Sequence, residues 1–246
     1  MTGRPSWRHV VAALLLVTPG TAIAPQAPND WPGAPTDLPI HEVPSRVAGR
    51  SLAVLITGDG GWADADRVLA TELANRGLPV VALDSRAYLR ATRRSPASAA
   101  ADAERIVRYY ADAWKRDEIV LIGYSRGADM MPFIANRLAQ DLRERIKLVA
   151  LVGLSPRASF EFHWSDLIRD ARRATDLPVG PELERLRGTR ILCVYGVDDK
   201  DSACRGGERA LMTPIERNGA HRIHVTDAAE LAELIMGAIA TETGGG

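Results

Sequence analysis

The sequence predicts an α/β fold built on a largely parallel sheet, and two observations support this prediction. Short apolar runs rich in valine, isoleucine and leucine recur along the chain, and such continuous runs are typical of strands covered on both faces. Amphipathic stretches alternate with them, as helices do when they connect parallel strands. With 246 residues, 46% of them hydrophobic, the chain can bury one sizeable core, so we expect a single globular domain.

The expected strands and helices begin after residue 50 and define a domain at residues 51–243. The expected strands are Leu52–Thr57, Pro79–Leu83, Ile119–Tyr124, Leu148–Leu154 and Ile191–Tyr195, with a further short strand around Ile215. The expected helices are Asp64–Asn75, Ala97–Trp114, Arg126–Leu142 and Asp227–Ile239. Because helices that connect parallel strands lie on the faces of the sheet, we expect them on both faces.

Residues 1–24 have the order of a secretory signal peptide. Basic residues precede the apolar run Val10–Val17, and small residues follow it. The run is far shorter than the roughly 20 residues that a membrane span needs, so the sequence predicts export to the periplasm and no anchor. Cleavage after Ala22, Ala24 or Ala27 is open. Residues 25–50 are rich in proline and lack helical periodicity, which predicts an N-terminal arm with at most a short edge strand.

The charges of the chain are balanced. Thirty-one basic and thirty-one acidic residues give a formal net charge of zero. This balance removes the whole-molecule attraction on which binding to nucleic acid or to an anionic membrane would depend. We therefore expect no nucleic-acid partner.

The chain has two cysteines, Cys193 and Cys204, which lie eleven positions apart near the end of an expected strand and in the loop after it. Two thiols are too few for a structural zinc site, and their spacing is not the CxxC of a redox enzyme. In an oxidising compartment they favour a structural disulfide. Such a bridge would hold the loop between them.

The strand Ile119–Tyr124 ends in a Gly-x-Ser-x-Gly turn. Gly123 and Gly127 flank Ser125, and an expected helix begins at the next residue. In this context the motif is typical of a nucleophile elbow, which lifts a serine out of the sheet to a helix N-terminus that favours negative charge. The motif thus predicts an α/β-hydrolase fold with Ser125 as the nucleophile. As a plain turn between strand and helix, it would carry no chemistry.

A serine hydroxyl needs an adjacent base, and in α/β-hydrolases the acid and then the histidine follow the serine along the chain. His221 and His224 have this order, and His221 is favoured because small residues precede it in a loop before the last helix. The acid is expected just after the strand Ile191–Tyr195. Three aspartates lie there: Asp199 and Asp201, which suit the role almost equally, and Asp198.

Acyl transfer also needs two backbone N–H donors for the oxyanion. One is expected from Arg126, which follows the nucleophile, and the other from Asp59 or Gly60 in the glycine-rich loop after the first strand. Such a loop could also cradle a phosphate, but this one lacks the GxxxxGK[ST] lysine and the GxGxxG pattern. The predicted chemistry is two-step acyl transfer without a metal or an organic cofactor.

Five ordered stretches resemble the VirJ/AcvB family of bacterial virulence-associated proteins: TGDGGW at 57–62, LDSRAY at 83–88, GYSRGADMMPF at 123–133, GLSPRASFEFH at 153–163 and CVYGVDDKDSAC at 193–204. The resemblance implies a periplasmic serine hydrolase with the α/β-hydrolase fold and Ser125 as nucleophile. It also implies a substrate class, because AcvB-like members are associated with hydrolysis of the aminoacyl ester of lysyl-phosphatidylglycerol. The chain departs from the family's pattern at Arg126, where an aromatic residue is usual, and in the loop around His221.

The candidate substrate-binding residues offer charge or an aromatic surface near these motifs: Trp62, Asp129, Glu161 and His163. An aminoacyl lipid carries an amine that carboxylates would meet and a phosphate that an arginine would meet, and its hydrolysis would bring the enzyme into transient contact with a membrane surface. Two alternatives stay open. One is an esterase that acts on a small soluble ester, and the other is a non-catalytic periplasmic protein that binds or escorts an exported protein partner on the same fold.

Overall fold

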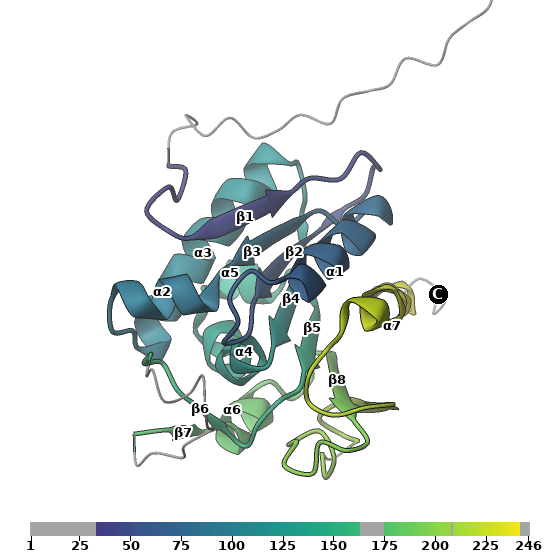
Figure 1. The fold of residues 1–246 in the computed structure, drawn as a ribbon. Helices are drawn as coiled ribbons and strands as arrows, with labels where there is room; N and C mark the ends of the chain where they lie inside the picture. The colour runs from purple at the N-terminus through teal and green to yellow at the C-terminus, as the bar shows by residue number, and fades with distance from the viewer. Residues whose placement is uncertain (1–32, 163–174, 208, 242–246) are drawn as a thin grey trace, which may run out of the picture.

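A seven-stranded, mostly parallel sheet forms the centre of the computed structural model, which describes residues 33–162, 175–207 and 209–241 (Figure 1). The strand order is β1-β3-β2-β4-β5-β8-β9, and every neighbouring pair is parallel except β1 with β3. The strands are β1 (Ile40–Val43), β2 (Ser51–Ile56), β3 (Val80–Leu83), β4 (Glu118–Tyr124), β5 (Ile146–Val152), β8 (Ile191–Gly196) and β9 (Thr213–Arg217). A separate two-stranded sheet pairs β6 (Arg157–Ala158) with β7 (Leu177–Pro178).

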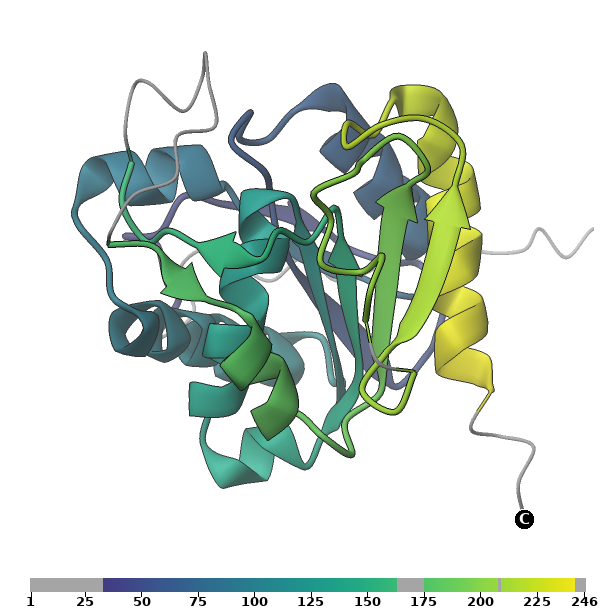
Figure 2. The same ribbon diagram turned by 90° about the horizontal axis from the view of Figure 1, so that it is seen from below.

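Helices cover both faces of the large sheet, as the sequence predicts. On one face α1 (Asp64–Asn75) lies beside α7 (Ala228–Ala240), and Figure 2 shows them in blue and yellow on the same side of the strands. The other face is covered by α3 (Pro96–Ala113) and α4 (Arg126–Arg137). The remaining helices are short: α2 (Ser85–Ala91), α5 (Gln140–Arg143), α6 (Gly180–Arg185) and the 3-10 turn η2 (Val225–Asp227).

The central strands carry continuous buried apolar runs because both of their sides are covered. Along β2, Val54 belongs to the core under α3 and α4, whereas Leu55 belongs to the core under α1 and α7. Side chains alternate along a strand, so a continuous apolar run supplies both cores at once. The predicted parallel sheet is therefore confirmed, and the carboxyl ends of β2, β3, β4, β5, β8 and β9 lie at one edge.

The N-terminal arm contributes β1 to the edge of the sheet, where it pairs antiparallel with β3. This is the short edge strand that the sequence allows. The predicted signal peptide at residues 1–24, and residues 25–32 of the arm, lie outside the described residues. None of the helices in the described ranges combines the length and the hydropathy that a membrane span requires.

The helix expected over Arg126–Leu142 is wrong at its C-terminal end. Helix α4 stops at Arg137, Leu138 and Ala139 take extended backbone angles, and a separate helix, α5, follows. A tertiary contact explains the break, because the N–H of Ala139 donates to the carboxylate of Glu104 on α3 at 3.1 Å and not to a helical carbonyl. The apolar periodicity continues across the break, so it gives no sign of it.

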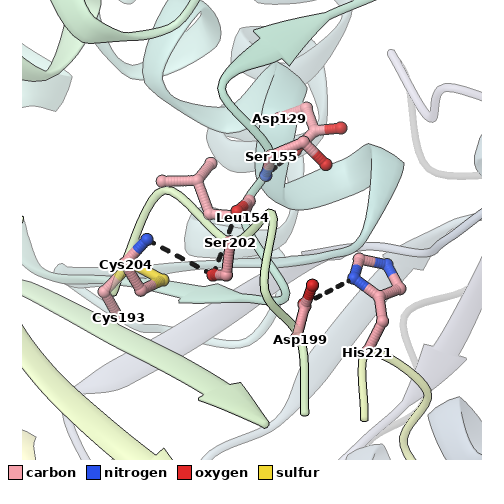
Figure 3. The surroundings of a disulfide bond; sticks show 8 residues. All are labelled: Asp129, Leu154, Ser155, Cys193, Asp199, Ser202, Cys204 and His221. Carbon is pink, nitrogen blue, oxygen red and sulfur yellow. Dashed lines mark hydrogen bonds and ion pairs between the residues drawn. A yellow bond between two sulfur atoms is a disulfide. The ribbon is translucent and has the colours of Figure 1, made fainter. Parts of the chain in front are cut away.

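The predicted disulfide between Cys193 and Cys204 is confirmed. Both cysteines are fully buried. The loop that the bridge closes is also fastened to the chain after β5, since the Ser202 hydroxyl donates to the carbonyl of Leu154 at 3.2 Å (Figure 3). The Ala203 N–H donates to the same carbonyl at 2.8 Å. The loop after β8 is thus held at two points.

Replacing both cysteines by alanine is expected to lower the free energy of unfolding by about 2 to 3 kcal/mol, because the unfolded chain regains the freedom that the bridge removes. Denaturant melts measure the change. The control is wild-type protein unfolded with and without reductant, because the reductant breaks the disulfide and leaves both cysteine side chains in place. Equal unfolding midpoints for oxidised and reduced wild type would contradict the prediction.

Candidate active site

Ser125 lies in a strained turn between β4 and α4. Its φ of 52° is in the left-handed region that non-glycine residues rarely adopt. The turn is fixed by its own backbone, because the Ser125 N–H donates to the carbonyl of Val152 at 2.8 Å and its carbonyl accepts from the N–H of Asp129 at 3.0 Å. Such a turn presents the serine hydroxyl above the sheet at the first turn of a helix.

The glycines of the motif are required by close backbone contacts. A Cβ on Gly123 would lie 2.4 Å from the carbonyl oxygen of Gly127, and a Cβ on Gly127 would lie 2.0 Å from that of Ile56. A side chain at either position would force β4, α4 and β2 apart. The turn that the sequence indicates therefore has the steric reason that the motif implies.

A chain of two hydrogen bonds joins Ser125 to His221 and His221 to Asp199. Ser125 Oγ lies 2.8 Å from His221 Nε2, and His221 Nδ1 lies 2.9 Å from Asp199 Oδ2 (the second contact is drawn in Figure 3). A carboxylate accepts from Nδ1–H, so this contact leaves the Nε2 lone pair for the serine proton. The Asp199 side chain is only 10% exposed, whereas that of His221 is 42% exposed and open to solvent.

The structure separates the alternatives that the sequence left open for the base and the acid. His224 is exposed at the start of η2, where its backbone N–H donates to Asp227 at 3.0 Å. Asp198 and Asp201 are also exposed. The side chains that meet at Ser125 are therefore those of His221 and Asp199.

Two further glycines let the histidine loop approach, and the sequence analysis missed both. Gly153, which follows β5, has a φ of +67°, and a Cβ on it would lie 3.0 Å from His221 Cε1. Gly196, the last residue of β8, would place a Cβ 2.3 Å from the carbonyl oxygen of Ala220. Gly153 follows a buried apolar run and Gly196 ends one. The position of a glycine at the end of an expected strand was the sequence signal that could have identified them.

Tyr124, the variable residue before the nucleophile, also holds the histidine loop. Its ring is stacked against the His221 ring at a centroid distance of 6.5 Å, and its hydroxyl accepts the N–H of Ile223 at 3.1 Å. The sequence analysis gave Tyr124 no role, because the pattern of the motif leaves that position free. The same strand end thus positions both the serine and the loop that carries the histidine.

The glycine-rich loop after β2 lies directly beside the serine. A Cβ on Gly58 would be 3.2 Å from Ser125 Cβ. Asp59, which is partly exposed, and Gly60, which is exposed, follow it. Both expected sources of oxyanion-hole donors, this loop and Arg126, therefore flank Ser125, while their role in catalysis stays a prediction.

Three of the four candidate substrate-binding residues have partners within the protein. Trp62 stacks on His41 of β1, with ring centroids 4.9 Å apart and planes inclined by 9°. The Glu161 carboxylate forms an ion pair with Arg93. Asp129 accepts the N–H of Ser155 at 2.7 Å. His163, the fourth candidate, lies outside the described residues.

The Asp129 carboxyl has a strongly raised pKa. Burial raises it to about 8, and the hydrogen bond from Ser155 and the charge of Arg126 oppose this effect only in part. At neutral pH the group is therefore mainly protonated, so it can donate a hydrogen bond but is a weak partner for a cation. Its contact with a substrate amine stays a prediction.

Residues 50–243 match the family of bacterial virulence proteins described as VirJ. The chain belongs to the VirJ family. Solved structures similar to this VirJ-family chain include the thioesterase domain from the curacin biosynthetic pathway, at 18% identity and a TM-score of 0.56, with 80% of this chain and 94% of that one covered. Est1E from Butyrivibrio proteoclasticus is similar at 14% identity and a TM-score of 0.58, with 82% of this chain and 93% of that one covered. MenH from S. aureus is similar as well, at 14% identity and a TM-score of 0.60, with 83% of this chain and 98% of that one covered.

At these identities the likeness shows the fold, and it confirms the predicted α/β-hydrolase fold for this VirJ-family protein. No curated protein matches the sequence. The family and the fold agree with the position of Ser125 at the carboxyl edge of the sheet, where α/β folds place their sites.

Gly153→Ala is expected to slow the reaction of Ser125 with a fluorophosphonate by roughly 10- to 100-fold, because the new Cβ would push the His221 ring out of hydrogen-bonding distance. Labelling rates measure this effect. Gly188→Ala is the matched control, since Gly188 also has a positive φ, +92°, but has no atom within 4 Å of the added Cβ. Equal labelling rates for the two variants would contradict the prediction.

Asp129→Asn is expected to change how stability depends on pH. The unfolded carboxyl ionises near pH 4 and the folded one near pH 8, so wild type loses stability relative to the variant as pH rises between these values. The asparagine keeps an oxygen for the Ser155 N–H. Urea melts at pH 5 and pH 8 measure the difference.

Asp66, whose pKa burial raises to about 6, titrates in both proteins and cancels from this comparison. Asp198→Asn, a change at an exposed carboxylate, controls for the general effect of removing a negative charge. A stability difference between wild type and Asp129→Asn that is the same at pH 5 and pH 8 would rule out the raised pKa.

Proposed function

We propose that this VirJ-family protein is a serine hydrolase that cleaves an ester by two acyl-transfer steps. The observation that carries the proposal is the hydrogen-bonded series Ser125, His221 and Asp199, with Ser125 in a strained turn at the start of α4. Three side chains from three separate loops meet in the order that nucleophilic catalysis requires. The hydrolase fold is the scaffold on which this arrangement is expected.

The chemistry follows from the roles that these atoms can take. His221 Nε2 accepts the Ser125 proton as Oγ attacks the ester carbonyl, and it then gives that proton to the leaving alcohol. Asp199 holds the other proton on Nδ1 and stabilises the imidazolium. A water deprotonated by the same Nε2 then releases the acyl group from Ser125. Backbone N–H groups of Arg126 and of the loop at Asp59 and Gly60 receive the oxyanion in both steps.

For the substrate we propose the aminoacyl ester of an aminoacyl-phosphatidylglycerol of the lysyl-phosphatidylglycerol type. The resemblance of the five motifs to the VirJ/AcvB family supports this choice. Charged side chains near the nucleophile also support a polar substrate, because the Arg126–Asp59 pair begins at the residue after Ser125 and the Arg126 guanidinium lies 3.5 Å from the carbonyl of Glu161, which pairs with Arg93. The disulfide supports action outside the cytoplasm, in agreement with the predicted signal peptide.

The test of the hydrolase is labelling of the mature protein with a fluorophosphonate, followed by mass spectrometry to locate the adduct. Wild type is expected to be labelled at Ser125, and Ser125→Ala to be inert. His221→Ala should label far more slowly, because the serine loses its base. Ser159→Ala, at a hydroxyl that is not part of the hydrogen-bonded series, is the control and should react like wild type. An unreactive wild-type serine would favour the non-catalytic binding or escort protein.

The test of the substrate follows the release of amino acid from vesicles. With lysyl-phosphatidylglycerol in the bilayer, wild type should release lysine, and Ser125→Ala should lower the rate by at least about a thousandfold. Vesicles of plain phosphatidylglycerol give the background. A labelled serine without lysine release would leave the hydrolase intact and point to a small soluble ester.

A further inference from the structure

The loop after β2 contains a turn with unused backbone donors. The N–H of Gly61 donates to the carbonyl of Gly58 at 2.9 Å, which closes a turn with Asp59 and Gly60 at its centre. Within the described part of the chain, no acceptor engages the N–H of Asp59 or Gly60. Two neighbouring free donors beside a nucleophile can receive a developing oxyanion, provided that the loop is held still.

Hydrogen bonds to the start of α2 fix this loop only at its ends. The Ser85 hydroxyl donates to the carbonyl of Gly58 at 2.8 Å, and the N–H of Ser85 donates to Thr57 Oγ1 at 3.0 Å. At the other end, Asp84 accepts the N–H of Trp62 at 3.2 Å. None of these contacts reaches the central residues, which carry the free donors.

The side chain of Arg126 supplies the missing contact. Its Nε donates to Oδ1 of Asp59, and its guanidinium also approaches the carbonyl of Glu161 at 3.5 Å. The Arg126 side chain is 9% exposed and that of Asp59 is 35% exposed. Solvent screens this partly buried ion pair less than it would screen a pair on the surface. Loss of Asp59 would leave the charge of the largely buried Arg126 without this partner.

We propose that the Arg126–Asp59 ion pair is a positioning device that fixes the two halves of the oxyanion hole relative to each other. Arg126 contributes one backbone donor, and the turn at Asp59 and Gly60 contributes the other. Because the ion pair joins the side chains of these same residues, it constrains both donors at once. The inference rests on the proposed function, since an oxyanion forms only if Ser125 attacks an ester.

A device of this kind acts on the transition state and leaves the ground state almost unchanged. The carbonyl oxygen becomes an anion only as Oγ attacks, so misplaced donors lower kcat and leave KM nearly unchanged. Loss of a donor outright costs roughly 100- to 1000-fold in kcat, so a donor that is merely displaced should cost about 10- to 100-fold. The pH dependence of kcat should stay that of wild type, because the hydrogen bonds of His221 are not touched.

The experiment measures kcat and KM for p-nitrophenyl acetate, together with the affinity for phenylboronic acid, which forms a tetrahedral adduct on an activated serine. The variants are Asp59→Asn, Arg126→Met, the double variant and Arg126→Lys. Each of the first two should lower kcat and boronate affinity at least about tenfold at unchanged KM. The double variant should be no worse than Arg126→Met, because that change already removes the contact with Asp59. Arg126→Lys should recover part of the loss because it keeps a cation.

Arg137→Met is the matched control. Arg137 lies at the other end of α4 and pairs with the buried carboxylate of Glu182 at 2.9 Å, so its loss should lower stability without changing kcat. If Asp59→Asn and Arg126→Met behave like this control, the pair is only structural and the inference is wrong. If Arg126→Met does not fold, Asp59→Asn still tests the ion pair, because asparagine keeps the shape of the aspartate side chain. A wild-type protein inert to both ester and boronate would instead overturn the proposed function, and the inference with it.

Discussion

The close passage of β4, α4 and β2 at Ser125 is the constraint on which the rest of the site depends. Backbone atoms approach so tightly there that Gly123 and Gly127 leave no room for a Cβ. The left-handed backbone at Ser125 is costly by itself, and it persists because the hydrogen bonds to Val152 and Asp129 hold the turn on both sides. Without that turn the hydroxyl would have no fixed direction toward the histidine.

Loops from neighbouring strands are tied together so that the acid stays beside the base. The Asp129 carboxyl on α4 accepts from Ser155, the adjacent Leu154 carbonyl accepts from Ser202, and the disulfide fastens the loop that carries Asp199 (Figure 3). The histidine loop joins the same set, since the N–H of Asp198 donates to the carbonyl of Gly219 at 3.0 Å. The series of polar contacts therefore runs from the nucleophile's own helix to the acid loop.

The charged residues around the nucleophile are paired with one another within the protein. Arg126 pairs with Asp59, and Arg93 pairs with Glu161. Paired charges keep a site polar at a smaller cost of desolvation than lone charges would. The arm adds an aromatic contact from β1, where His41 stacks on Trp62 at the end of the glycine-rich loop. This part of the site is assembled from segments far apart in the sequence.

The sequence by itself determined the parallel sheet, the helices on its faces, the serine turn and the disulfide. Each of these leaves a local signal: a continuous apolar run, an amphipathic period, or a spacing of a few residues. Helix α1 even has the predicted bounds, Asp64–Asn75. Helix α2, which the sequence analysis missed, still carried a local signal, because Asp84 caps it through the N–H of Ala87 at 2.9 Å.

Three features were decided only by the tertiary structure. They are the choice of the carboxylate that contacts His221, the end of α4, and the pairing of Arg126 with Asp59. Asp199 and Asp201 suit the role of the acid almost equally in the sequence, but the direction of each side chain depends on how the loop is fastened to Leu154, after β5, and to Arg217 of β9. The end of α4 depends on a carboxylate from α3, and the ion pair joins residues 67 positions apart. Contacts over such separations leave no period in the sequence, because the folded chain alone brings their partners together.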